Sequence, residues 1–410
     1  MINKKIQMIM LFIILNLTIS SLVYAFTYQT QTQNITQTII RKWLSGWDKR
    51  VKITIDHNDI TSSLSNFPVL IYLSTSSGYN SDDVSFIFNE LQSDTNRKKI
   101  AVTTSDKTTQ CYVEIEKWDT SNMKAWLWVK VPSINSTVDT NLYLYYDKDQ
   151  VDNTHYVGDT VSTPAQNVWD SDYKGVWHLK EDPTGTAPQM KDSTSNTHHG
   201  TTTGMVSGDQ TSGKIDGSLN FDATDAYVQT TSGESKTSTS FTWEAWFKAD
   251  SITGAHLLLW EGPVAENGWG AGAVGHQEAH IHVGAYNVNN VVGAFYGTDE
   301  LANPVYINVA FTDTSAFHHV AFVLTNAGSS PSGELFLDGV SVGTDTGTQT
   351  SRTEWNTNLR IGRCGVSTRY FDGISDEVRV SNTVRSAAWI KASYESERDH
   401  LLDFGNEEVA

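Results

Sequence analysis

The chain of 410 residues is poor in cysteine and in basic residues, and each shortage excludes a class of protein. Only Cys111 and Cys364 occur, so a disulfide framework is excluded and the domains must fold on their hydrophobic cores alone. We expect two buried free thiols. Lys and Arg number 29 against 47 Asp and Glu, a net charge of −18. Nucleic acids and anionic lipids are bound by clustered Lys and Arg, so we expect no nucleic-acid partner.

Familiar catalytic motifs are also missing. The sequence has no nucleophile elbow, phosphate-binding loop or HExxH segment. Glycoside hydrolysis requires two neighbouring carboxylates, but Glu244 in FTWEAWFKAD has no acidic partner on its strand face. The nearest acidic group, Glu395, Glu397 and Asp399, lies in a polar tail. We therefore predict that the protein is not an enzyme.

A long apolar run is found only at the N-terminus, where it has the layout of a secretory signal. Lys4 and Lys5 precede the apolar run 6–17. The run is followed by Val23-Tyr24-Ala25, which has small or short residues at the two positions that a signal peptidase reads. An uncleaved anchor is the alternative, but polar residues interrupt the run before it reaches the ~20 apolar residues of a membrane span. We predict a signal peptide at 1–25, a secreted or cell-surface protein, and no span in the mature chain.

The next part of the chain reads as a leader, a small domain and a linker. Residues 26–42 are rich in Thr, Gln and Asn and have no apolar period, which is typical of a flexible leader. Residues 43–148 contain short alternating apolar segments separated by polar turns, which predicts a small antiparallel β-sandwich. Residues 149–166 are polar and non-periodic, so we place the linker there.

Two carboxylates in this first domain, Glu114 and Glu116, lie two residues apart on one strand face. Paired carboxylates can perform acid–base catalysis, but solvated outward positions on an alternating strand explain the spacing equally well. We predict the solvated, structural role.

Several segments of the first domain resemble a known family. WLSGWDKRVKITID, VEIEKWD, WLWVKVPSI and LYLYYDK are similar to domain of unknown function 2341. That family commonly precedes a laminin-G-like domain in exported proteins. The resemblance implies an architecture and assigns no chemistry.

Strand-like segments with a period of two dominate residues 241–382. They read FTWEAWFKAD, FHHVAFVLT, GELFLDGVSVG and YFDGISDEVRVSN. Asp338-Gly339 separates two alternating runs, which predicts a hairpin. In this order and spacing the segments resemble the laminin-G-like jelly roll of the concanavalin A-like superfamily. The resemblance implies an all-β chain, in which a small N-terminal β-sandwich is followed by a jelly-roll β-sandwich at 167–404.

The segment 257–297 departs most from a plain strand pattern, and there we look for a ligand site. Sugars have apolar ring faces that stack on Trp and Tyr, and hydroxyls that bond to His, Asn and Glu. The predicted ligand-binding residues combine these types: Trp260, Trp269, His280, His282 and Tyr286. The alternatives are that the tryptophans are core and the histidines solvated, or that His280 and His282 share a metal with His276.

Aspartates at the two ends of the jelly roll suggest a metal site. Asp192 lies in a loop rich in hydroxyls and amides, Asp222 lies in a turn, and Asp376 lies in FDGISDEV. Oxygen ligands of this kind suit calcium. Because the first and last strands of such jelly rolls lie side by side, we predict one structural calcium site at Asp192, Asp222 and Asp376. The alternative is that these are ordinary turn-forming aspartates.

Two classes of function are consistent with these features. The first is an extracellular binding module that recognises a glycan or another surface polymer. The second is a structural or adhesive surface protein that contacts other protein chains and has no affinity for sugars. We predict the first.

Overall fold

The computed structural model describes residues 43–410 apart from 232–239, 263–277, 286–287, 298–302, 328–329, 349–357 and 366–368, and in the N-terminal segment residues 4, 8, 10 and 15–24. Within this part of the chain, strands form four sheets and helices are few, which confirms the predicted all-β class. Residues 15–24 are helical. No described helix combines the length and apolarity that a membrane crossing requires.

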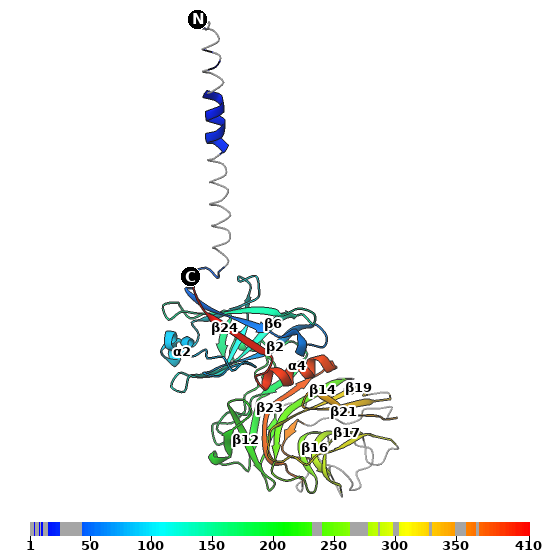
Figure 1. Cartoon of the computed structure of the whole chain (residues 1–410). Coiled ribbons are helices and arrows are strands. Elements are labelled where there is room, and N and C mark those ends of the chain that lie inside the picture. The colour runs from blue at the N-terminus through cyan, green and yellow to red at the C-terminus, as the bar shows by residue number, and fades with distance from the viewer. Residues whose placement is uncertain are drawn as a thin grey trace.

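The first domain is a sandwich of two sheets (Figure 1). One has the order β24 (Leu402–Val409), β1 (Lys49–Ile55), β7 (Thr140–Tyr146), β3 (Ile100–Thr103) and β4 (Gln110–Cys111). The other has the order β2 (Leu64–Leu73), β6 (Lys124–Ile134), β5 (Val113–Asp119) and β8 (Val157–Asp159). Alternate apolar residues of both sheets, such as Val51 and Ile71, fill one core, as the period of two predicts. A short helix, α2 (Phe86–Leu91), lies in the β2–β3 connection.

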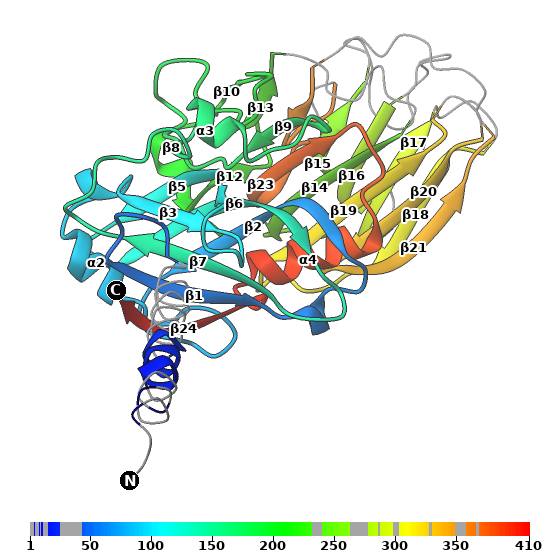
Figure 2. The same ribbon diagram turned by 90° about the horizontal axis from the view of Figure 1, so that it is seen from above.

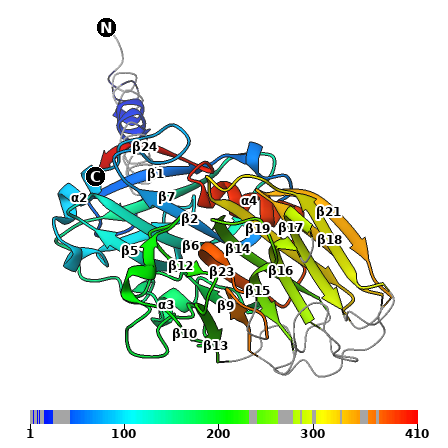
Figure 3. The same ribbon diagram turned by 90° about the horizontal axis from the view of Figure 1, so that it is seen from below.

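The second domain is a larger sandwich of two sheets. Its seven-stranded sheet has the order β10 (Gly200–Thr203), β13 (Tyr227–Thr230), β22 (Arg360–Ile361), β15 (His256–Glu261), β16 (Glu278–Ala285), β17 (Val288–Gly297) and β18 (Val305–Ala310). Its eight-stranded sheet has the order β11 (Gln210–Ser212), β12 (Gly217–Asp222), β23 (Asp372–Ser381), β14 (Phe241–Ala249), β19 (His318–Thr325), β20 (Ser332–Leu337) and β21 (Val340–Thr346), and β9 (Tyr173–Trp177) also pairs with β23. Figure 3 shows β15 to β18 side by side.

The predicted hairpin is the β20–β21 pair. Leu337 pairs with Val340, and Asp338 and Gly339 between them have φ angles of 49° and 77°. Positive φ at both central residues defines a type I′ turn, whose twist matches that of paired strands. The Asp-Gly dipeptide therefore acts as the sequence suggested.

The chain returns to the first domain at its C-terminus. After β23, helix α4 (Ala387–Glu397) crosses the junction between the domains, and β24 then pairs antiparallel with β1 (Figure 1). The jelly roll was expected to continue to residue 404, but Leu402 and Phe404 are buried in the first core. An alternating pattern predicts a strand but not the sheet that the strand joins. For this reason we had assigned these residues to the wrong domain.

The expected linker at 149–166 is also ordered. It contains β8, which pairs in parallel with β5 of the first domain, and the short helix α3 (Thr163–Gln166). Its polar composition does not prevent it from completing a sheet.

A continuous hydrophobic core joins the two domains. It includes Trp128 of β6, Tyr173 of β9 and Trp389 of α4. The rings of Phe67 and Trp389 lie 4.8 Å apart, and those of Trp128 and Trp169 lie 5.4 Å apart. Figure 2 shows α4 between the strands of the first domain and those of the second.

Charged groups are buried at the same junction. Glu114 and Glu116 are 0% and 5% exposed, so the prediction that they are solvated is wrong. Their strand face is covered by the second domain, from which His178 reaches both carboxylates. An alternating pattern shows which residues share a face but cannot show what covers that face.

The two cysteines, Cys111 and Cys364, are both free and buried. This confirms the prediction of two free thiols.

Candidate functional site

The outward face of the seven-stranded sheet carries a row of side chains, one from each strand. The register aligns Thr201, Gln229, Arg360, Trp260, His280, Phe295 and Tyr306. Their strand neighbours, such as Ile361 and Ile281, belong to the core between the sheets. Because successive side chains point to opposite faces, the row lies on the side away from that core.

A carboxylate links two members of the row. Glu278 Oε2 accepts a hydrogen bond of 2.9 Å from Trp260 Nε1, and Glu278 Oε1 lies 3.1 Å from His280 Nδ1. Burial raises the pKa of Glu278, but the contacts with His280 and Trp260 outweigh it and bring the pKa below its ordinary value. The carboxylate is therefore charged and holds both rings in place.

The histidines continue this packed surface. His280 stacks on Phe295 with ring centroids 5.0 Å apart and planes at 12°, and lies 5.2 Å from His282. His282 Nε2 is 2.7 Å from Asn308 Oδ1. Burial, followed by the effect of His280, lowers the pKa of His282 to about 3. His282 is therefore a neutral hydrogen-bonding group at physiological pH.

Arginines extend the row toward β13. Arg360 Nε donates to Gln229 Oε1 at 3.2 Å, and its Nη1 donates to the carbonyls of Cys364 and Gly365 at 2.9 and 2.8 Å. The guanidinium of Arg363 lies over the ring of Tyr227 at 4.7 Å. This position allows a cation–π interaction that orients the ring.

An open hollow of about 340 Å³ lies at this end of the row. Its lining consists of hydroxyl and amide groups beside one aromatic ring: Thr201, Thr203, Tyr227, Gln229, Thr230, Thr231 and Asn358. The polar groups can both donate and accept hydrogen bonds. The combination suits a neutral ligand with several hydroxyl groups.

The structure brings three of the five predicted ligand-binding residues together. Trp260, His280 and His282 lie on the same face, but each is 0% exposed. Their side chains are therefore covered and cannot stack directly on a ligand in this conformation. Trp269 and Tyr286, like His276, lie outside the described residues.

The partly exposed Tyr227 and Gln229 of this face, and the buried Arg360 beside them, were missed by sequence reasoning. Tyr227 and Gln229 alternate with the buried Val228 in YVQT, and Arg360 alternates with Ile361 in LRIGR. Alternation could have placed each on an outward face. Their common location required the order of the strands, because β13, β15 and β22 are far apart in sequence.

The three aspartates predicted to bind calcium have other partners. Asp192 accepts hydrogen bonds from the backbone N–H groups of Val176, Thr194 and His198 at 2.8–3.0 Å. Asp222 accepts from Thr224 N at 2.9 Å, as a turn-forming aspartate does.

Asp376 Oδ2 accepts from Ile215 N at 2.9 Å. Within the described ranges, neither Asp376 nor the other two aspartates belong to a group of three ligating side chains whose atoms lie within 4.8 Å of one another. The calcium site remains a prediction.

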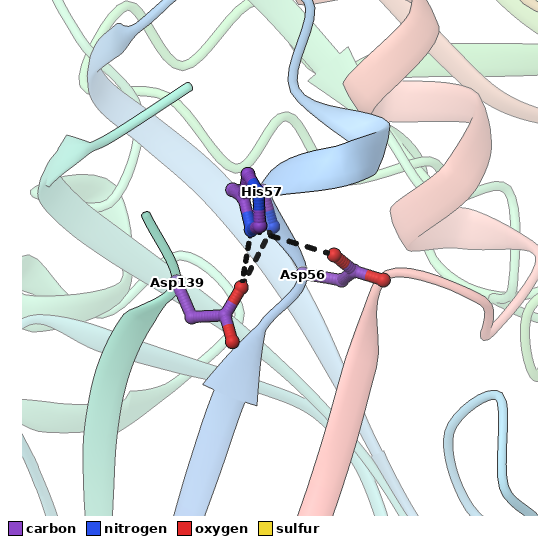
Figure 4. A group of neighbouring side chains, drawn as sticks. All are labelled: Asp56, His57 and Asp139. Carbon is purple, nitrogen blue, oxygen red and sulfur yellow. Dashed lines mark hydrogen bonds and ion pairs between the residues drawn. The ribbon is translucent and has the colours of Figure 1, made fainter. Parts of the chain in front are cut away.

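Three other groups of side chains in the described part of the chain reach that separation. One is Asp56, His57 and Asp139, where helix η1 (His57–Asp59) follows β1 (Figure 4). His57 Nδ1 lies 2.6 Å from Asp139 Oδ1 and 3.9 Å from Asp56 Oδ1. The group is partly exposed and Asp56 caps the helix through Asn58 N, so hydrogen bonding explains it.

The second group, Asp59, Glu395 and His400, is partly exposed through His400. The third group, Glu116, His178 and Glu377, is buried at the domain junction. It differs from the others in that all three of its residues are buried.

The four sheets define an all-β protein of two β-sandwich domains. Residues 222–391 match the family model of the concanavalin A-like lectin/glucanases superfamily, and residues 96–163 match domain of unknown function 2341. Both resemblances found in the sequence, and their order along the chain, are therefore confirmed.

Two solved structures are similar to parts of the chain at low sequence identity. Domain 4 of the extracellular arabinanase AbnA from Geobacillus stearothermophilus, in complex with arabinotriose, is 16% identical, with 54% of this chain and 97% of that chain covered and a TM-score of 0.41. The CBM40 of the Ruminococcus gnavus IT-sialidase, bound to α2,3-sialyllactose, is 18% identical, with 39% and 84% covered and a TM-score of 0.30. No curated protein matches the chain significantly.

Proposed function

We propose that the protein is a non-catalytic, extracellular carbohydrate-binding protein, and that the hollow lined by Tyr227 and Gln229 contacts the sugar. The observation that carries this proposal is the hollow itself, which places an aromatic ring among hydroxyl and amide groups at the open end of an ordered polar face. A pyranose or furanose ring presents the complementary surfaces, an apolar face and a rim of hydroxyls.

The buried part of the face supplies rigidity. Arg360 donates a hydrogen bond to Gln229 through Nε and hydrogen bonds to two backbone carbonyls through Nη1. Arg363 holds Tyr227. A site whose side chains are already fixed loses little conformational entropy when a ligand binds, so its affinity is higher than that of a mobile surface.

The extracellular location is proposed from the signal-like N-terminus and from the acidic surface, which favours solubility. Calcium at Asp192, Asp222 and Asp376 is a further expectation. It is tested by repeating the binding measurement with added calcium and with a calcium chelator.

The direct test is binding of the mature chain to a glycan and polysaccharide array, followed by titration calorimetry on the best ligand. We expect Tyr227→Ala and Gln229→Ala each to weaken binding by about 2- to 12-fold, since an aromatic stacking contact or a hydrogen bond is worth about 0.5–1.5 kcal/mol. Tyr79→Ala is the matched control, because Tyr79 is 40% exposed and belongs to the first domain.

Binding that survives both hollow variants would reject this site. No binding to any glycan, together with self-association or capture of a protein partner, would reject the function in favour of a structural or adhesive role.

A further inference from the structure

We propose that the junction between the two domains holds a structural zinc ion, bound by Glu116, His178 and Glu377. These residues come from three separate segments: β5 of the first domain, the residue after β9, and β23 of the second domain. Their ligand atoms lie within 4.8 Å of one another and all three residues are buried. The site is independent of the carbohydrate-binding hollow.

The geometry around His178 fits a metal ligand. Its Nδ1 is 2.7 Å from Glu377 Oε1 and 3.4 Å from Glu116 Oε2. Two ligands on a tetrahedral zinc ion, each about 2.1 Å from the metal, are about 3.4 Å apart. The distance from His178 Nδ1 to Glu116 Oε2 already has this value. A small movement of Glu377 away from His178 would lengthen the Nδ1 to Glu377 Oε1 distance to the same value.

The opposite nitrogen of the same ring has the partner that metal-binding histidines usually have. His178 Nε2 lies 3.3 Å from Glu114 Oε1. A hydrogen bond from Nε2 to this carboxylate would leave the Nδ1 lone pair directed at Glu116 and Glu377. At protein zinc sites, the imidazole nitrogen that does not bind the metal commonly donates a hydrogen bond to a carboxylate. That hydrogen bond fixes the tautomer of the histidine and raises the basicity of its metal-binding nitrogen.

The carboxylates are themselves held by further groups. Trp128 Nε1 donates to Glu116 Oε2 at 2.7 Å, and Arg379 Nη2 donates to Glu377 Oε2 at 2.7 Å. Glu114 accepts from Ser193 Oγ and from Trp169 Nε1, each at 2.7 Å. These contacts orient all three carboxylates toward the imidazole.

The observation that points to a missing cation is an oxygen without a partner. Glu116 Oε1 is buried and has no hydrogen-bond partner among the described residues, and the side chain is 0% exposed. In this part of the chain, Glu114 and Glu116 have no ion pair with Lys or Arg and share one imidazole. An ionised carboxylate that is buried without a compensating charge destabilises the folded protein, and a divalent cation between Glu116 and Glu377 would offset this free-energy cost.

The backbone is shaped to present these ligands. Glu116 is the extra residue of a bulge, because Ile115 pairs with Leu127 and Lys117 with Trp126. Glu377 has a φ angle of 50° and lies in a second bulge, in β23. Bulges redirect side chains and are frequent beside functional sites.

The choice of zinc follows from the ligand types. Imidazole nitrogen together with carboxylate oxygen suits zinc, whereas calcium takes oxygen ligands in larger number. The site is enclosed, so we assign the ion a structural role in which it joins the first domain to the second.

The experiment is elemental analysis of the mature protein purified without chelator. We expect about one equivalent of zinc per chain, lost in Glu116→Gln and in His178→Gln. Glu114→Gln should retain the site with about 10- to 100-fold lower zinc affinity, measured by competition with a chelating dye. The matched control is His57→Gln, which alters the exposed group in Figure 4 and should leave the zinc content unchanged.

A second measurement covers the case in which the variants fail to fold. Wild-type protein stripped with chelator should show a Tm that rises when zinc is added, because a ligand that binds only the folded state stabilises it. If the purified protein contains no zinc and added zinc does not raise this Tm, the proposal is wrong and protons balance the buried charges. A larger rise with manganese or calcium would also overturn it.

Discussion

At the scale of single residues, the outward face of the seven-stranded sheet is a set of polar side chains buried with fixed partners. Trp260 and His280 share Glu278, and His282 faces Asn308. Buried polar groups of this kind specify a unique arrangement only when their hydrogen bonds are made. The protonation states of Glu278 and His282 should therefore matter for folding.

His282 makes stability depend on pH. Its pKa is about 3 in the folded protein, lowered first by burial and then by His280, and about 6.5 in the unfolded chain. The unfolded state binds more protons between these values, so stability falls as the pH falls below about 6.5. From pH 7 to pH 5 the loss should be about 2 kcal/mol.

The measurement is the free energy of unfolding by urea at pH 7 and pH 5. His282→Gln should lose about 2 kcal/mol less than wild type over this interval. The matched control is His155→Gln, since His155 is exposed and should keep the wild-type pH dependence. Equal pH dependence in wild type and His282→Gln would show that His282 titrates normally in the folded protein.

At the scale of elements, the strand that matters most is β24. Phe404 pairs with Ile53 and is 5% exposed, whereas Val409 at the other end of the strand is 66% exposed. The same strand therefore contains one residue inserted in the first core and one in solvent.

Phe404→Ala should destabilise the protein by about 3–5 kcal/mol, because it removes a large buried side chain and leaves a cavity. Val409→Ala should change stability by less than about 0.5 kcal/mol, as exposed substitutions usually do. Both values come from chemical denaturation at one pH. A mild effect of Phe404→Ala would mean that β24 contributes little to the first core.

The secondary-structure elements were predicted from the sequence better than the packing between them. Alternation and the Asp-Gly turn identified β14, β19 and β23 of the second domain and the β20–β21 hairpin. Alternation shows which face of a strand a residue is on, but it does not show which strand or domain packs against that face. The sheet that β24 joins and the burial of Glu114 and Glu116 could therefore not be predicted. Trp260, His280 and His282 lie on one face of the sheet, but alternation could not predict that all three are buried.

At the scale of the whole molecule, the two domains share one core and a buried charged junction. Trp389 of α4 packs on Phe67 of β2, and Arg385 lies over the Trp389 ring at 4.1 Å. Interfaces between domains are usually more polar and permit relative motion. A hydrophobic junction with buried ion pairs favours a rigid arrangement.

We therefore expect one cooperative unfolding transition by calorimetry, with equal calorimetric and van't Hoff enthalpies. Trp389→Ala should separate this transition into two, because it removes the aromatic contact between α4 and β2 at the junction. The exposed position Val151, 81% accessible, supplies the control Val151→Ala. Two transitions in the wild-type protein would show that the domains unfold independently.

The pairing of β24 with β1 also has a consequence for biosynthesis. Ile55 pairs with Leu402, so the first sheet gains β24 only after residues 402–409 have been translated. During that interval the edge of β1 is open, and open strand edges pair with other chains. Pairing of β24 is then the step that covers this edge, and a chain truncated before residue 402 would leave it open to aggregation.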